Sequence, residues 1–302
     1  MNKQPKITQK LLSLFSVVRV YNIIFLIVAI YLAAIYILAP QKRLRTILLD
    51  YNLLIIILSS SLSIAAGYII NNFYDSKKDA INRPLKRVID NSLSKETVLK
   101  IYFLLNFLAV TISFIISWRA ALFFAVYIFW IWFYSHKLKR ITIIGNLVAS
   151  TLSIIPFFAV FLYYKNFNKI ILFHAVFLYF ILTAREILKD LANIKGDLLT
   201  NQKTIPIVYS IQMAKYSVLA LLFISVIPIY YIINLPEIGN MYYYFYLIIA
   251  SLPFYSYFIL KAKTEAQYKL IHLFLKFSLI LGVLSIILID SDVIIKAIER
   301  QL

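Results

Sequence analysis

Apolar segments long enough to cross a bilayer recur along the whole chain, and they restrict the folds that the chain can adopt. The chain has 302 residues, 62% of them hydrophobic, and its mean hydropathy is +0.85. A spanning helix needs about 20 apolar residues, and inside lipid only helices or closed barrels satisfy every backbone hydrogen bond. The sequence therefore predicts an all-α, polytopic membrane protein that forms a single domain over residues 1–302. The nine expected spans are residues 20–40, 52–74, 97–117, 119–135, 142–164, 170–189, 215–234, 241–261 and 268–289.

The charge of the chain is strongly basic, with 31 Lys and Arg against 13 Asp and Glu and a net charge of +18. Topogenic charge in cytoplasmic loops explains much of this excess. A polyanionic substrate would explain the basic residues that surround the acidic segments described below. Nucleic acid is not an expected partner, because no soluble basic domain is present to hold it. Cysteine is absent, which excludes disulfides, thiolate catalysis and Cys-ligated metals.

The distribution of Lys and Arg between the loops predicts an orientation. Of the 31, 22 fall in the N-terminal segment and in the loops on its side of the membrane, and 8 fall on the opposite side. The positive-inside rule then places the N-terminus in the cytoplasm of a cell whose plasma (inner) membrane this protein spans. Both acidic segments would face the cytoplasm.

Two acidic segments lie more than a hundred residues apart, over residues 71–79 and 185–197. Carboxylates near a bilayer are costly and therefore usually functional. Residues spaced by three or four share one face of a helix, and we expect helix to continue to about Asn82 in the first segment and to about Gly196 in the second. Carboxylate and amide oxygens are the ligands that Mg²⁺ prefers. The expected ligands are Asn71, Asp75 and Asp79 in the first segment and Glu186, Asp190, Asn193 and Asp197 in the second.

Other interpretations of these acids remain open at this point. They could be solvated residues at helix ends, or part of a proton or ion relay in a transporter. Relay carboxylates usually lie near the middle of the bilayer, on helices broken by Gly or Pro. With 5 Gly and 8 Pro in the chain and the acids at helix ends, the sequence disfavours an ion-coupled transporter.

Several motifs resemble those of the UbiA-type intramembrane prenyltransferases. The N-x-x-x-D-x-x-x-D pattern of Asn71, Asp75 and Asp79 is similar to the segment that ends the second helix of that family. Further matching segments are Arg19–Asn22, Ile81–Pro84, Tyr134–Arg140, Gly145–Asn146, Gly196–Asp197 and Lys203–Pro206.

Within that family, the Arg185–Asp190 segment most resembles the branch that makes digeranylgeranylglyceryl phosphate. Asn193 stands where that branch usually has Asp, so one negative charge is missing. The resemblance implies helices bundled around a central cavity and a Mg²⁺-dependent transfer of a prenyl group, here geranylgeranyl, from its diphosphate to a glycerol-phosphate lipid. Aromatic acceptors of quinone synthesis, or the vinyl group of a porphyrin in haem synthesis, are the alternatives. Protein partners cannot be predicted.

The same resemblance suggests roles for the residues around the acids. The departing diphosphate needs cationic stabilisation, although Lys137, Lys139 and Arg140 equally fit topogenic charge. Tyr74 and Tyr134 adjoin the motifs and could offer ring faces to an allylic cation. Arg19, Asn22 and Arg185 could bind the phosphate of the acceptor, with interface anchoring as the alternative for Arg19. The candidate catalytic residues are Asp75, Asp79, Asp190, Asp197 and Lys137. The candidate substrate-binding residues are Arg19, Asn22, Tyr74, Arg83, Lys86, Arg87, Tyr134, Lys139, Arg140 and Arg185.

Overall fold

The computed structural model describes residues 7–82, 84 and 93–292, and the regular elements in this part of the chain are all helical. Nine helical stretches among these residues are long and apolar enough to cross a membrane, which confirms the predicted fold class. Their bounds are Val20–Leu38 (α2 Val20–Ala33 and the π-helix η1 Ala34–Leu38), Tyr51–Tyr74 (α4), Lys95–Ser113 (α7), Trp118–Arg140 (α8 Trp118–His136 and η2 Leu138–Arg140), Ile144–Tyr164 (α9), Lys169–Leu191 (α10), Ile211–Ile233 (α13 Ile211–Ile224 and α14 Val226–Ile233), Pro236–Lys261 (η3 Pro236–Met241 and α15 Tyr242–Lys261) and Glu265–Ile289 (α16 Glu265–Ser285 and η4 Ile286–Ile289).

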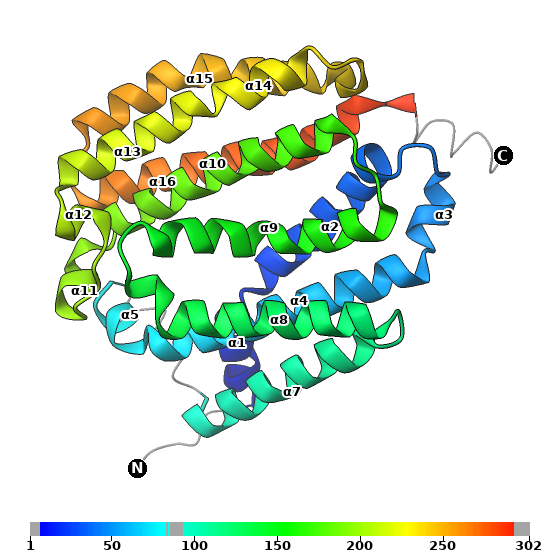
Figure 1. The fold of residues 1–302 in the computed structure, drawn as a ribbon. Helices are drawn as coiled ribbons and strands as arrows, with labels where there is room; N and C mark the ends of the chain where they lie inside the picture. The colour runs from blue at the N-terminus through cyan, green and yellow to red at the C-terminus, as the bar shows by residue number, and fades with distance from the viewer. Residues whose placement is uncertain (1–6, 83, 85–92, 293–302) are drawn as a thin grey trace.

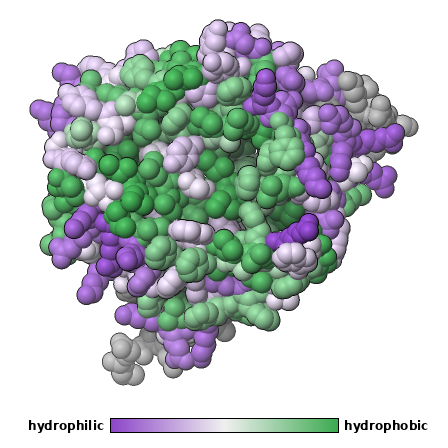
Figure 2. Space-filling view, in the orientation of Figure 1, coloured by the Kyte–Doolittle hydropathy of each residue, from purple (hydrophilic) through white to green (hydrophobic). Residues whose placement is uncertain are grey.

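The short helices lie at the ends of the bundle or beside it. They are α1 (Ile7–Val18), α3 (Leu44–Leu48), α5 (Ser76–Asn82), α11 (Ile194–Leu199) and α12 (Ile205–Val208). In Figure 1, α5, α11 and α12 gather at the left end, whereas α3 lies at the right end. Figure 2 shows a broad hydrophobic face between hydrophilic residues at these two ends. The membrane normal therefore runs from left to right in both views, and both acidic segments lie at the left end.

Helix α10 lies inside the bundle, against α9, α13, α14 and α16, while α4 packs against α7 and α8. The apolar residues of α10 recur every three or four positions, the spacing that lines one face of a helix. The buried members of this face are Phe177, Ile181, Ala184, Leu188 and Leu191. This packing fixes the end of α10, and hence the second acidic segment, against the rest of the fold.

The helix that carries the first acidic segment is interrupted at Asp75, where the sequence predicts continuous helix to Asn82. α4 ends at Tyr74, Asp75 has ψ near 1°, and α5 begins at Ser76. The backbone N–H groups of Asp75 and Asp79 still donate to the carbonyls of Asn71 (2.9 Å) and Asp75 (2.8 Å). The spacing that relates Asn71, Asp75 and Asp79 therefore survives the interruption.

The prediction that the second acidic helix ends near Gly196 is wrong. α10 ends at Leu191, Asn193 has φ −125° and ψ 17°, and α11 begins at Ile194. The side-chain amide of Asn193 donates to the carbonyl of Lys189 at 2.6 Å and so replaces a backbone donor of a continuing helix. Asp197 consequently lies on a separate short helix from Glu186 and Asp190.

Candidate active site

The two acidic segments, far apart in the chain, contact each other directly at one end of the bundle. The backbone N–H of Gly196 donates to Asn82 Oδ1 at 3.1 Å, and Asn82 Nδ2 donates to the carbonyl of Asn193 at 3.4 Å. A Cβ built on Gly196 would lie 2.3 Å from Asn82 Nδ2, so any larger residue at position 196 would displace the Asn82 side-chain amide from its hydrogen bonds to α11. Lys78 of α5 adds an ion pair with Asp197 of α11. The two segments therefore oppose one another, as the site hypothesis requires.

Lys139, from η2 between α8 and α9, neutralises the first segment. Its ammonium donates to Asn71 Oδ1 at 2.7 Å and forms an ion pair with Asp75. Burial alone would raise the pKa of Asp75, but Lys139 and Lys78 outweigh it and hold that pKa below its usual value. Asp75 is therefore an anion at neutral pH. Asp79 follows one turn later and is half-buried.

The second segment is anchored to α9 and to its own helix. Asp190 Oδ2 accepts a hydrogen bond from Asn146 Nδ2 at 2.8 Å. Glu186 accepts from Lys189 at 2.6 Å, and the guanidinium of Arg185 lies 3.8 Å from it. Three parts of the fold thus meet here: α4 with α5, η2 with α9, and α10 with α11.

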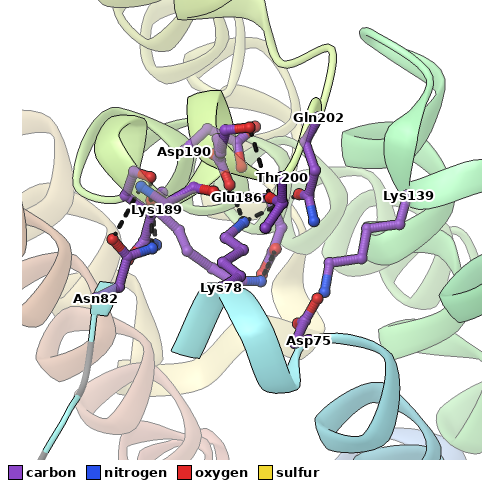
Figure 3. A network of polar contacts seen from close by, with 12 residues as sticks. Asp75, Lys78, Asn82, Lys139, Glu186, Lys189, Asp190, Thr200 and Gln202 are labelled. Atoms are coloured by element: carbon purple, nitrogen blue, oxygen red, sulfur yellow. Dashed lines mark hydrogen bonds and ion pairs between the residues drawn. The ribbon is translucent and has the colours of Figure 1, made fainter. Parts of the chain in front are cut away.

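Lys78 lies in the middle of this network, as Figure 3 shows. Besides its ion pair with Asp197, its ammonium donates to Gln202 Oε1 at 3.0 Å. Burial would lower the pKa of Lys78, but the carboxylates of Asp197 and Asp75 outweigh it and raise that pKa above its usual value. The sequence interpretation missed Lys78, Gln202 and Asn146 as site residues. The spacing of four and three from Asn71 through Asp75 to Lys78 was the available signal for Lys78.

The remaining candidates of the first segment and of the loop before α9 fall into two groups. Tyr74 and Tyr134 are half-buried beside the acids; the hydroxyl of Tyr74 lies 3.1 Å from His136 Nδ1, and Tyr134 is within electrostatic range of Glu186. Lys137 and Arg140 are exposed. The predicted diphosphate-binding residues Arg83, Lys86 and Arg87 lie outside the described residues.

The candidates for the acceptor phosphate gather around Tyr68 of α4. Arg19, with φ 54° and ψ 54° between α1 and α2, places its guanidinium 5.0 Å from the centre of the Tyr68 ring. Asn22 Nδ2 donates to the Tyr68 hydroxyl at 3.1 Å. Arg185 acts electrostatically on the same tyrosine, and its Nε is buried without a hydrogen-bond partner. Two guanidinium groups therefore converge at the start of the first acidic segment.

The donor set fits magnesium, although the described residues contain no ready-made cluster of three Asp, Glu or His groups around one point. The oxygen donors come from both segments. Lysine ammonium groups form ion pairs with Asp75, Glu186 and Asp197. Mg²⁺ typically uses only one or two carboxylates together with waters and substrate phosphates. A few carboxylates on each segment are enough for such an ion.

An apolar cavity of about 450 Å³ lies on the side of the bundle away from the acids. It is lined by α2, η1, α9, α10, α15 and α16. Its size and its apolar lining are typical of pockets for small molecules. Measured along α10 at about 1.5 Å per residue, its nearest lining residue, Leu178, is about 12 Å from Glu186, and Leu172 is about 21 Å from it. Residues of its wall and floor include Ala33, Ile37, Phe161, Ala175, Tyr244 and Gly282.

The comparisons with known proteins agree with this geometry. The model of the UbiA prenyltransferase family matches residues 24–280. The chain belongs to the UbiA prenyltransferase family. It is thus a membrane-embedded prenyltransferase, and the resemblance read from the motifs is confirmed.

Two curated relatives of this chain carry the same name. Digeranylgeranylglyceryl phosphate synthase of Methanobrevibacter smithii is 28% identical over 247 residues, covering 78% of this chain and 81% of the relative. The synthase of Methanosphaera stadtmanae is 30% identical over 68% of this chain and 75% of its own length.

Two solved structures show the same fold at low sequence identity. A structure of digeranylgeranylglyceryl phosphate synthase has a TM-score of 0.65 at 21% identity, covering 92% of this chain and 97% of the other. A UbiA homolog from Archaeoglobus fulgidus bound to DMAPP and Mg²⁺ has a TM-score of 0.64 at 15% identity, covering 91% and 99%.

Proposed function

We propose that this prenyltransferase transfers a geranylgeranyl group from geranylgeranyl diphosphate to geranylgeranylglyceryl phosphate in a Mg²⁺-dependent reaction. The observation that carries the proposal is the meeting of two acidic segments, interleaved with lysines, at one end of a bundle whose helices also line an apolar cavity. The shared name of its relatives favours this acceptor. We further propose that residues 1–302 act as a single domain.

The diphosphate of the donor would bind between the two segments. Bound Mg²⁺ would neutralise charge on the leaving group, and the residues proposed to hold it are Asp75, Asp79, Glu186 and Asp190 with the amide of Asn71. Asn193 and Asp197 are the other ligands that the sequence predicts. The ammonium of Lys139, already next to Asp75, can turn to a diphosphate oxygen once that carboxylate has another cation. Lys137 and Arg140 lie on the same exposed turn and can add charge from the solvent side.

The prenyl chain of the donor would extend from this site into the apolar cavity. The cavity begins about 12 Å from Glu186 along α10. The first isoprene units would therefore lie between Glu186 and the cavity. When the C1–O bond breaks, its electron pair leaves with the diphosphate and an allylic cation forms at C1. The ring of Tyr134 is suitably placed near the acids to stabilise such a cation.

The acceptor phosphate would bind to Arg19 and Arg185, which gather around Tyr68. Guanidinium groups pair with phosphate oxygens in a bidentate manner, and the buried Nε of Arg185 has an unused proton for this purpose. Asn22 would help to hold Tyr68 in place. The free hydroxyl of the acceptor then bonds to C1 and releases its proton to the surrounding carboxylates.

The orientation of the protein remains a proposal. The excess of Lys and Arg, 22 against 8, favours a cytoplasmic N-terminus and a cytoplasmic active site in the plasma membrane. Cysteine accessibility offers a direct test because the chain has no native Cys. A single Cys at exposed Lys137 should react with a membrane-impermeant maleimide only in inverted vesicles. Reaction in right-side-out vesicles alone would reverse the orientation.

An acceptor panel tests the function itself. Purified protein in detergent receives geranylgeranyl diphosphate and Mg²⁺, with geranylgeranylglyceryl phosphate, 4-hydroxybenzoate, dihydroxynaphthoate or haem in turn. Only the glycerol-phosphate lipid should be prenylated. Transfer to an aromatic acid or to haem, with none to the lipid, would replace the proposed acceptor by the aromatic or porphyrin alternative.

A further inference from the structure

One lysine lies inside a membrane-spanning helix and not in a loop. Lys276 belongs to α16, within the spanning stretch Glu265–Ile289. At about 1.5 Å per residue, it lies about 17 Å from Glu265 and about 20 Å from Ile289 along the helix, near the middle of the span. The positive-inside rule concerns loops and does not account for a lysine at this depth. A charge here is costly, and such charges usually serve the function of the protein.

The contact that holds Lys276 is aromatic. Its ammonium lies 4.6 Å from the centre of the ring of Tyr21, a residue of α2, which contacts α16. The side chain of Lys276 is half-buried. Among the residues that the structure describes, no carboxylate lies within ion-pair distance of its ammonium. A ring face attracts an ammonium less strongly than a hydrogen-bonded anion does, so an incoming anion would stabilise this lysine further.

Lys276 lies beside the residues that we propose to bind the acceptor phosphate. Its partner Tyr21 acts electrostatically on Tyr68, the tyrosine around which Arg19 and Arg185 gather. Three cationic side chains therefore approach this part of the fold, one from the junction of α1 and α2, one from α10 and one from α16. An anion with several oxygens is the ligand that such a group of cations favours.

The position of Lys276 along α16 relates it to the reaction. His272 precedes it by one turn, on the same face of the helix, and acts electrostatically on Glu186, a proposed metal ligand. Leu279 follows Lys276 by three residues and lines the apolar cavity. Lys276 therefore lies between the metal ligands and the cavity. The phosphate of the acceptor should bind at this level, because its carbon is next to the one whose hydroxyl attacks C1 of the donor.

We propose that Lys276 binds the phosphate of the lipid acceptor from the α16 side, together with Arg19 and Arg185, and so selects acceptors that carry a phosphate. When the acceptor binds, the ammonium turns from the ring of Tyr21 and donates to the phosphate oxygens. This inference rests on the proposed function, because it takes the acceptor to be a glycerol-phosphate lipid. It adds a binding residue that lies outside both acidic segments.

Equilibrium binding tests the inference without any turnover. Purified protein in detergent, without donor or metal, is titrated with radiolabelled geranylgeranylglyceryl phosphate or with geranylgeranylglycerol, which lacks the phosphate. Bound lipid is measured by scintillation proximity. Wild type should bind the phosphate lipid more tightly than the alcohol. Lys276→Met removes the charge and keeps an unbranched side chain. It should raise the Kd for the phosphate lipid about tenfold, as for one lost hydrogen bond between charged groups, and leave the Kd for the alcohol unchanged.

Three further variants complete the experiment. Lys276→Arg keeps the charge and should retain the preference for the phosphate lipid. Lys269→Met makes the same substitution at an exposed position of α16 and should bind both lipids like wild type. Lys276→Gln is a second neutral variant, for the case in which Lys276→Met does not fold. An equal rise of both Kd values in the neutral variants would show a structural role and overturn the inference. Unchanged Kd values for both lipids would overturn it as well.

The acceptor panel separates a failure of this inference from a failure of the proposed function. If wild type prenylates geranylgeranylglyceryl phosphate while Lys276→Met keeps the full preference for the phosphate lipid, only the role of Lys276 is wrong. If wild type prenylates an aromatic acid or haem and binds both lipids equally, the proposed acceptor is wrong and the inference fails with it.

Discussion

Both ends of the bundle contain hydrogen-bonded carboxylates, several at one end and Asp50 at the other, but the partners of these carboxylates differ in kind. At the acidic end, Asp75 and Asp197 pair with lysines. At the opposite end, Asp50 accepts from the hydroxyls of Tyr163 at 2.8 and 3.0 Å and of Tyr164 at 3.3 Å.

The difference separates a site that exchanges ligands from one that supports the fold. Ammonium groups can give up a carboxylate to a metal ion and turn to a phosphate. Neutral hydroxyls on Asp50, which also caps α4 through the N–H of Leu53 at 3.2 Å, have no such alternative. Changes at the acidic end should therefore affect transfer, and changes at the Asp50 end should affect stability.

Removal of the metal should have the largest effect. EDTA should reduce geranylgeranyl transfer to background, and excess Mg²⁺ should restore it, because the leaving diphosphate would otherwise depart without neutralisation. Product formation by the detergent-purified enzyme is the measurement. Activity that persists in EDTA would mean that the lysines of the site suffice without metal.

Loss of one carboxylate should have the second-largest effect on transfer. Asp75→Ala or Asp190→Ala should lower transfer by about 10²–10³-fold, the range seen when one preorganised electrostatic group is removed. The thermal unfolding temperature in detergent should change little for Asp75, whose partner Lys139 can bind Asn71 alone. Near-normal turnover in either variant would contradict the metal assignment.

Much of the fold could be predicted because each span is a local property of the sequence. The seventh span was expected from residue 215 and begins at Ile211, and the acidic segments were located from spacing alone. The breaks at Asp75 and Asn193 could not be found in this way. At Asn193 a single side-chain amide ends the helix. The backbone carbonyl of Asn193 accepts a hydrogen bond from Asn82 Nδ2, more than a hundred residues away.

The cavity and the role of Lys78 depend on distant contacts too. Residues from several helices line the cavity, and no pattern within one helix shows which helices will come together around it. Lys78 was missed as a site residue because its acceptors, Asp197 and Gln202, follow it by more than a hundred residues.

A substitution in the apolar cavity should alter the selectivity for the prenyl donor more than the rate of transfer. Ala175 lines it, so Ala175→Phe should shorten the space for the prenyl chain. The ratio of kcat/KM for geranylgeranyl over farnesyl diphosphate should fall by about tenfold, since missing room in an apolar pocket changes selectivity by that order. Ala220→Phe on the exposed face of α13 is the matched control and should leave the ratio unchanged. An equal ratio in both variants would show that the prenyl chain of the donor does not bind in this cavity.

The smallest effect is expected at the Asp50 end, and there it should appear only in stability. Tyr163→Phe removes the hydroxyl that donates to Asp50 and should lower the free energy of unfolding by about 1.5–3 kcal/mol, as for a hydrogen bond to a charged group. Unfolding in mixed micelles measures this loss, and Tyr257→Phe, at a 59% exposed position, is the control. Transfer per folded molecule should stay at the wild-type value, because this end provides no group to the reaction. A loss of transfer without a loss of stability would show that the two ends are coupled, and the division between them would no longer hold.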